Sequence, residues 1–266
     1  MKNSLDKASI GGLLVGFAAI IGGLLLEGGK ISQILQPTAA MIVFGGTAGA
    51  VLLHFPLPVV TSALRSLARV FLESEEDLEA GIKLLVHLAN RARREGIVRL
   101  DSELEQIGDP FLRRALMLAV DGTEPQELRD IMELEIDNQS ERGEQFCGVF
   151  DSAGGFSPTV GIIGAVLGLI QVMQHLDKID EVGRGIAVAF VATIYGVAAA
   201  NLLFLPAGGK LRIRLREQQI HSEMMLEGVI SILEGMNPRM LETKLRSFAS
   251  ENHAHVPQAK AAGVGA

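Results

Sequence analysis

Residues 152–175, SAGGFSPTVGIIGAVLGLIQVMQH, contain no Asp, Glu, Lys or Arg and are rich in glycine and apolar side chains. At about 1.5 Å per helical residue, this stretch is long enough to cross a hydrocarbon core of about 30 Å. Three more stretches lack charged side chains, at 8–26, 31–64 and 185–209. Pro56 and Pro58 end the second helix near Phe55, because proline removes a helical hydrogen bond. The pattern predicts four membrane spans, at about 9–26, 37–55, 153–175 and 184–207.

The composition also favours a membrane protein. Hydrophobic residues make up 48% of the chain and aromatic residues only 5%, and many of the 30 glycines lie within apolar stretches. Small residues of this kind let membrane helices pack closely. The net charge of −7 argues against nucleic acid as a partner, because phosphate binding needs a basic surface. Cys147 is the single cysteine, which excludes an internal disulfide and a cysteine-based metal cluster.

The basic residues near the span ends predict the orientation, because cytoplasmic loops carry an excess of Lys and Arg. One side carries Lys2, Lys7, Arg65, Arg69, Lys210, Arg212, Arg214 and Arg216. The opposite loops carry only Lys30, Lys178 and Arg184. We therefore expect both termini and the long segment between the second and third spans to face the cytoplasm.

Five parts follow along the chain. Residues 1–55 hold spans 1 and 2, 56–150 form a cytoplasmic helical insert, 151–209 hold spans 3 and 4, 210–249 form cytoplasmic C-terminal helices, and 250–266 form a disordered tail. The insert carries nineteen acidic and eleven basic residues, and its apolar spacing is helical, with no strand pattern. The expected fold is an all-α membrane protein with four transmembrane helices, a large insert between spans 2 and 3, and a cytoplasmic C-terminal helix.

Local signals place the cytoplasmic helices. We expect helices from Asp77 to Arg94, after Asp109-Pro110, after Thr123-Glu124-Pro125 towards the third span, from Leu211 to Glu234, and from Pro238 to about Phe248. Gly96 ends the first of these, and Asn237 caps the last.

The sequence shows no catalytic constellation: no phosphate-binding glycine loop, no His-Glu-x-x-His and no nucleophile beside a base. We expect neither an enzyme nor a cofactor. A charged side chain at mid-bilayer usually marks an ion route, and none occurs in the four spans. If ions cross, the titratable carrier must come from another chain.

The spans carry neutral polar residues instead, at Thr47, Ser157, Thr159, Thr193, Tyr195 and Asn201. Their side chains either line a path or bond the backbone of their own helix. Pro158 and Pro206 predict bends in spans 3 and 4, as fixed kinks or as hinges. The Gly45–Gly49 and Gly164–Gly168 spacings predict helix-packing faces.

Several ordered motifs are together specific to one family. They are FSPTVGIIGAVLGL at 156–169, GIAVAFVATIYG at 185–196, Pro206, Leu226-Glu227-Gly228, EGMNPR at 234–239, Leu26-Glu27-Gly28-Gly29 and Gly45-Gly46-Thr47. Over residues 5–249 the chain resembles motility protein A (MotA), of the MotA/TolQ/ExbB superfamily.

The resemblance implies an ion-conducting stator subunit of the bacterial flagellar motor, in the inner (cytoplasmic) membrane. Five such subunits would encircle two MotB-type B subunits, each with a single aspartate-bearing span and a peptidoglycan-binding domain. Thr193 would line the ion path beside that aspartate, together with Ala165 and Tyr195. Pro158 and Pro206 would shape the conformational response to its protonation.

Ala165 also indicates the ion by resemblance. Sodium-driven members have a threonine at this position, seven residues after the proline, and a hard cation needs oxygen ligands. We therefore expect proton coupling, with sodium coupling as the alternative.

The resemblance places rotor-facing charges on the insert, at Arg93, with Arg94 as its neighbour, and at Asp101 and Glu103. They would contact a flagellar rotor switch protein of the FliG type, and the alternative is an ordinary solvated face. Besides that protein, the expected partners are the B subunit and membrane lipid. Competing interpretations are a TolQ/ExbB-like energiser, which has three spans, and a scaffolding membrane protein that conducts nothing.

Overall fold

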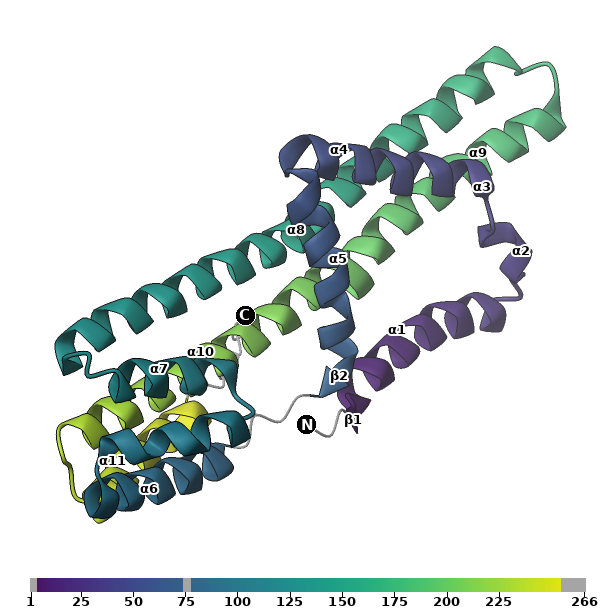
Figure 1. Ribbon diagram of the computed structural model, residues 1–266. Helices are drawn as coiled ribbons and strands as arrows, with labels where there is room; N and C mark the ends of the chain where they lie inside the picture. The colour runs from purple at the N-terminus through teal and green to yellow at the C-terminus, as the bar shows by residue number, and fades with distance from the viewer. Residues whose placement is uncertain (1–3, 74–77, 255–266) are drawn as a thin grey trace, which may run out of the picture. The chain divides into compact units, whose positions relative to one another are not determined.

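The computed structural model describes residues 4–73 and 78–254. It divides into two compact units (Figure 1). The first unit comprises Met1–Glu75 and Arg142–Arg214, and the second comprises Glu76–Glu141 and Leu215–Ala266. Two long helices, α8 (Pro125–Gln174) and α10 (Leu205–Leu233), contribute residues to both units. Each unit is described by itself.

Four helical runs are long and apolar enough to cross a membrane, which confirms the four-span prediction. The first is α1 (Lys7–Leu26). The second joins α2 (Ile31–Ile34), α3 (Pro37–Ala40), the π-helix η1 (Met41–Gly45) and α4 (Gly46–His54). The third is the later part of α8. The fourth is α9 (Ile179–Ala198), which continues through the π-helix η3 (Ala199–Phe204) into α10.

The second span ends where its prolines predict. Phe55 is the C-terminal cap of α4, and Pro37 opens α3 at the first helical position. A helix that we did not expect, α5 (Leu57–Phe71), follows at once and packs against α1 and α4. Below it, β1 (Ser4–Leu5) and β2 (Leu72–Glu73) form a two-residue antiparallel pairing. This pairing joins two parts of the first unit that are distant in sequence.

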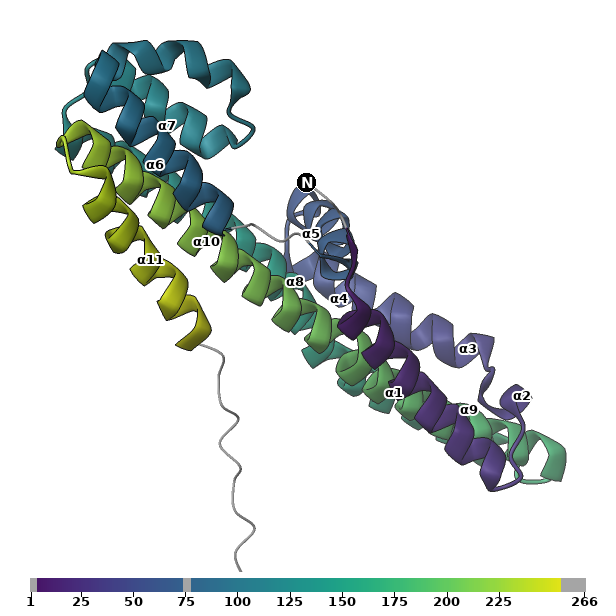
Figure 2. The same cartoon turned by 90° about the horizontal axis from the view of Figure 1, so that it is seen from below.

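Helices α8 and α9 run antiparallel and pack backbone against backbone (Figures 1 and 2). A Cβ added at Gly161 would lie 2.9 Å from the carbonyl oxygen of Ala192, and one at Gly168 would lie 2.8 Å from that of Gly185. Only glycine permits this approach, which confirms a packing face at the Gly164–Gly168 spacing. A Cβ added at Gly45 or at Gly49 would meet nothing within 4 Å among the residues that the structure describes.

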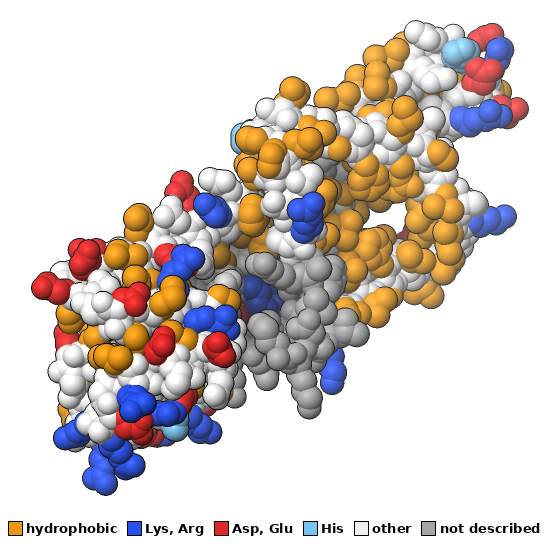
Figure 3. Space-filling view, viewed as in Figure 1, with side chains coloured by type: hydrophobic (Ala, Val, Ile, Leu, Met, Phe, Trp, Pro, Cys, Tyr) orange, Lys and Arg blue, Asp and Glu red, His pale blue; other side chains and the backbone are white. Residues whose placement is uncertain are grey.

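The rest of the first unit's surface is largely apolar. Figure 3 shows hydrophobic side chains spread over its helices. Exposed large apolar side chains include Leu14, Val15, Leu53, Met173 and Phe190. A soluble protein rarely exposes apolar surface on this scale, so these faces meet lipid or other chains.

The second unit is a compact helical body with its own core. It contains α6 (Leu78–Glu95), the 3₁₀-helix η2 (Ile97–Gln106), α7 (Pro110–Val120), the start of α8, the end of α10, and α11 (Pro238–Ala254). The largest fully buried side chains of this core are Ile82, Leu85, Leu88, Leu100, Leu112, Leu116, Leu128, Met132, Met224, Ile230, Leu241 and Leu245. Leucine and methionine from every one of these helices meet in a single cluster.

The caps predicted at Asn237 and Gly96 are present, and Asp109 is a further cap that was not predicted. The Asp109 carboxylate accepts the backbone N–H groups of Phe111 and Leu112 at 2.8 and 3.3 Å, and Asn237 accepts that of Arg239 at 3.0 Å. Gly96 ends α6 with φ 87°, a conformation that favours glycine. The 3₁₀-helix η2 was not predicted.

Two expectations fall partly outside the described residues. Asp77, the predicted start of the first insert helix, lies outside them. So do residues 255–266 of the expected disordered tail, whereas α11 continues to Ala254 and includes the first residues of that segment.

Candidate functional site

The third and fourth spans are in direct contact at Ser157 and Gly196. The Ser157 hydroxyl donates a hydrogen bond to the Gly196 carbonyl oxygen at 3.0 Å, and both residues are buried. A Cβ at Gly196 would lie 2.5 Å from the Ser157 carbonyl oxygen and 3.2 Å from the Cα of Pro158. Pro158, inside the continuous helix α8, therefore stands at the point where the two backbones touch.

Thr193 lies near the third span, one turn before Gly196 on α9, and Ala165 lies on the third span itself. The Cα of Thr193 is 3.5 Å from where a Cβ at Gly161 would lie, and Thr193 and Ala165 are both half-buried. The Thr193 hydroxyl donates to the carbonyl oxygen of Ala189 at 3.2 Å, one turn back along its own helix. Within this single chain its hydroxyl therefore makes the local backbone bond that polar residues in spans commonly make.

Tyr195 holds the start of the second span. Its hydroxyl donates to the Ile34 carbonyl oxygen at 2.5 Å and accepts the Gln36 N–H at 3.3 Å. Its ring lies 6.1 Å from that of Phe44. The hydroxyl thus gives hydrogen-bond partners to two backbone groups at the break between α2 and α3, which the helices themselves leave unpaired. The resemblance gave Tyr195 an ion-path position, and the geometry shows it binding a neighbouring span.

Pro206 follows a stretch of π-helix. It is the second residue of α10, it is exposed, and η3 ends two residues before it. Proline has no N–H to donate, and a wide π turn is one way in which a membrane helix adapts to the missing bond. Pro158 and Pro206 thus both interrupt the hydrogen bonding of spans 3 and 4.

Thr47 is the exception among the polar residues of the spans. It is buried in α4, at 3% exposure, and its hydroxyl has no hydrogen-bond partner among the described residues. In contrast, the side chains of Thr159 and Asn201 bond their own helices, to Phe156 and Val197.

Asp6 forms a charge cluster at the start of the first span that sequence reasoning missed. Its buried carboxylate pairs with Lys210 and lies 3.7 Å from Arg214, and it caps α1 through the N–H groups of Ala8 and Ser9. The hydrogen bond from Lys210 lowers the pKa of Asp6 to about 2. The carboxylate therefore stays ionised and ties the start of α1 to α10.

The four rotor-facing candidates divide into two kinds. Arg93 and Arg94, in the last turn of α6, and Asp101, on η2, are exposed. Across residues 4–73 and 78–254 none of these three forms an ion pair with another side chain. Glu103 instead pairs with Arg91, which also lies 3.5 Å from Glu95. The three exposed charges are free to meet a partner, whereas Glu103 is half-buried and joins η2 to α6.

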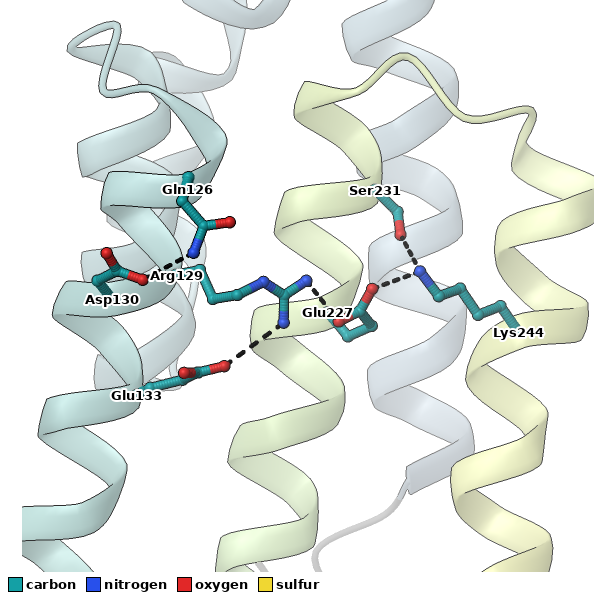
Figure 4. Close-up of polar contacts among 7 residues, drawn as sticks. All are labelled: Gln126, Arg129, Asp130, Glu133, Glu227, Ser231 and Lys244. Carbon is teal, nitrogen blue, oxygen red and sulfur yellow. Dashed lines mark hydrogen bonds and ion pairs between the residues drawn. The ribbon is translucent and has the colours of Figure 1, made fainter.

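A network of hydrogen bonds between partly buried charged side chains joins helices of the second unit (Figure 4). Glu227 of α10 accepts hydrogen bonds from Arg129 of α8, at 2.9 Å, and from Lys244 of α11, which also reaches Ser231 at 3.3 Å. Burial raises the pKa of Glu227, but the hydrogen bonds from Lys244 and Arg129 lower it more, so the net pKa falls below its ordinary value. One carboxylate thus joins three helices. The Leu-Glu-Gly motif contained this residue but gave no sign of its role.

The chain matches two family models. The one described as "MotA/TolQ/ExbB proton channel family" covers residues 103–224, and "Motility protein A N-terminal" covers residues 10–96. Motility protein A of Bacillus subtilis (strain 168) is 36% identical over 92% of this chain and 91% of that protein. Chemotaxis protein PomA of Vibrio alginolyticus is 31% identical over 93% of this chain and 96% of that protein.

Solved structures agree with these matches. "Structure of C. jejuni MotAB" has a TM-score of 0.87 at 32% identity, covering 92% of this chain and 96% of that one. The flagellar MotAB stator complex from Bacillus subtilis has a TM-score of 0.85 at 35% identity, covering 94% and 100%. The fold is thus that of a four-span, all-α membrane protein of the MotA/TolQ/ExbB superfamily. Within that superfamily, the chain belongs to the motility protein A family.

Proposed function

We propose that the chain is the ion-conducting subunit of a flagellar stator, working with a one-span B subunit that is anchored to peptidoglycan. The observation that carries the proposal is that the stretches 8–26, 31–64, 152–175 and 185–209 hold no Asp, Glu, Lys or Arg. An ion path through a membrane needs a titratable or coordinating group, so the carboxylate comes from the partner. The related chains of known structure are described as MotAB complexes, which supports this arrangement.

The same family includes TolQ and ExbB proteins, and two observations favour the stator over that alternative. The N-terminal match is specific to motility protein A and covers residues 10–96. Four spans are present, where an energiser of the TolQ/ExbB type would have three. A ring of five copies around two B subunits is the assembly that we propose by analogy with the family.

The loop charges support a placement in the bacterial inner membrane with both termini and the second unit in the cytoplasm. Lys7, Lys210 and Arg214 lie on the side that we assign to the cytoplasm, and two of them surround Asp6. The positive-inside rule favours this orientation. There the second unit would present Arg93, Arg94 and Asp101 to a rotor protein of the FliG type. Such exposed charges steer and register a contact more than they strengthen it.

We propose that the ion is the proton. The Ala165 side chain has no oxygen to offer a sodium ion, and the Thr193 hydroxyl is bonded to its own helix. A proton needs no coordination shell, only the partner's carboxylate.

Complementation tests this function. The chain would be expressed with its B subunit in a bacterium that lacks stator genes, and swimming would be scored. We expect motility to return with the wild-type pair and to be lost when the B subunit's intramembrane aspartate is replaced by asparagine. Motility that is independent of this chain would overturn the proposal, as would motility that survives the aspartate change.

A further inference from the structure

The end of the fourth span holds one polar side chain, that of Asn201. The stretch 196–209, GVAAANLLFLPAGG, is otherwise made of glycine, proline and apolar residues. Asn201 lies within the π-helix η3 and is exposed, whereas its neighbours Ala199 and Ala200 are buried. The amide of Asn201 therefore lies on the outer surface of the first unit, within a span that is otherwise apolar at this depth.

One atom of the Asn201 amide has no partner in the chain. The amide nitrogen donates to the Val197 carbonyl oxygen at 2.9 Å, one turn back along the same span. Because a carbonyl oxygen can only accept, the nitrogen faces it and the amide oxygen, Oδ1, is left over. Oδ1 accepts no hydrogen bond from residues 4–73 or 78–254. An unpaired amide oxygen is costly in hydrocarbon, so Oδ1 meets water or another chain rather than lipid.

Asn201 continues a row of side chains that begins at Thr193. Thr193, Val197 and Asn201 are spaced four residues apart, so they lie one above another along α9 and η3. Val197 is 46% exposed, and Thr193 is half-buried. In an α-helix such a row drifts by about 40° around the axis at each step of four residues, and the wider turns of η3 reduce this drift. The π-helix therefore keeps Asn201 near the line that Thr193 starts.

The position of Asn201 matches a need of the proposed ion path. A proton that leaves a carboxylate beside Thr193 still has to reach the cytoplasm, and Asn201 lies eight residues further along, or about 12 Å at 1.5 Å per residue. Between the two, the row offers only Val197, and the Tyr195 hydroxyl is already bonded to the start of the second span. Water that carries a proton over this distance needs polar partners in an apolar span.

We propose that Asn201 lines the cytoplasmic half of the ion path and that its Oδ1 accepts a hydrogen bond from water there. The partner's carboxylic acid gives its proton to this water and becomes a carboxylate, and the proton leaves through the water to the cytoplasm. The Asn201 amide keeps its own protons throughout, so it positions the water and does not titrate. This inference rests on the proposed stator function and adds a second polar group to the path beyond Thr193.

The first test removes the amide and keeps the size of the side chain. Asn201→Leu would be compared with Asn201→Gln, which keeps an amide, in vesicles that contain the full complex with the B subunit. We expect Asn201→Leu to lower proton flux per complex about tenfold or more, the factor that loss of one hydrogen bond to a charged group supports. Melting temperature should not change, and Asn201→Gln should restore most of the flux. Wild-type flux in Asn201→Leu would overturn the inference.

Thiol labelling decides the outcome even if Asn201→Leu does not assemble. In a full complex with a cysteine-free B subunit, Asn201→Cys should react with a small cationic thiol reagent added from the cytoplasmic side, and the reaction should abolish the flux that remains. Two controls should not react: Leu14→Cys, on the exposed apolar face of α1, and the wild-type chain, whose single cysteine, Cys147, is buried.

An unreactive Asn201→Cys would overturn the inference, because the side chain would then face lipid or a second copy of the chain. Absence of flux in the wild-type pair would instead count against the stator function itself.

Discussion

The Ser157 hydroxyl donates a hydrogen bond to the carbonyl oxygen of Gly196, 39 positions later in the chain, at 3.0 Å within the buried contact between spans 3 and 4. The bond lies next to Pro158, whose missing N–H already weakens the hydrogen bonding of α8. The hydrogen bond thus joins span 3 to span 4 next to the proline that interrupts the backbone hydrogen bonding of span 3. Movement of one span in response to ion binding would therefore be transmitted directly to the other.

Gly196→Ala tests this contact. The added Cβ would lie 2.5 Å from a backbone oxygen, which cannot rotate away, so the spans must separate. We expect a loss of about 1–3 kcal/mol in unfolding free energy and loss of motility. Gly183→Ala, also on α9 but with nothing within 4 Å of its Cβ position, is the matched control. Equal melting temperatures for the two purified variants would contradict the close packing.

Glu227→Gln tests the network of the second unit. It removes the charge that Arg129 and Lys244 share, and we expect a loss of about 1–3 kcal/mol in stability, measured by thermal melting of the full complex. Glu133→Gln is the control. Glu133 also faces Arg129, at 3.5 Å, but it is more exposed, so its loss should cost less than about 1 kcal/mol. If Glu133→Gln lowers the melting temperature as much as Glu227→Gln does, the hydrogen bonds of Glu227 do not stabilise the second unit in the way proposed.

The pH dependence follows from the same carboxylate. The pKa of Glu227 is lower in the folded protein than its ordinary 4.5, so its contribution to stability is complete above about 4.5. It is lost as the pH falls from there through the folded pKa. Melting temperature should therefore drop on acidification below pH 4.5, and Glu227→Gln should flatten this part of the curve. An identical acid profile in both proteins would refute the link.

Arg93→Glu and Arg91→Glu should fail in different ways. Arg93 has an exposed side chain, so its reversal should abolish torque, leave melting unchanged, and be rescued by a reversed charge on the rotor protein. Arg91 pairs with Glu103, so its reversal should lower the melting temperature as well. Motility assays with a panel of rotor charge variants give the comparison. Normal torque after reversal of both Arg93 and Asp101 would show that these charges form an ordinary solvated face.

The ion can be tested by separating the two gradients. We expect torque to persist without sodium and to vanish when the proton gradient is dissipated, because Ala165 and Thr193 give sodium too few oxygens. Torque that follows sodium alone would show that the missing hydroxyl at Ala165 is replaced by other ligands.

The spans and caps could be predicted because their signals are local. The lack of charge over 152–175 predicts a span from its length alone, and Asn237 caps a helix through the N–H of a residue only two positions away. The helix η2 escaped prediction because short 3₁₀ segments carry no strong period. The two-residue β1–β2 pairing is too short to show alternation.

The side-chain contacts of the site could not be predicted for a different reason. Tyr195 bonds Ile34 across 161 positions, and Arg129 bonds Glu227 across 98. Nothing in a local pattern fixes which distant residue faces a given side chain. The motifs located Thr193, Tyr195 and Glu227 as residues of interest, but only packing shows that Tyr195 holds a neighbouring span and that Glu227 joins three helices.

The central claim is that this chain forms the wall of an ion path whose carboxylate belongs to a partner. The most direct measurement is proton flux into vesicles containing the purified chain alone, the chain with its B subunit, or the chain with a B subunit whose intramembrane aspartate is asparagine. The account predicts flux only with the intact pair. Flux through the chain alone, or undiminished flux with the asparagine variant, would contradict it.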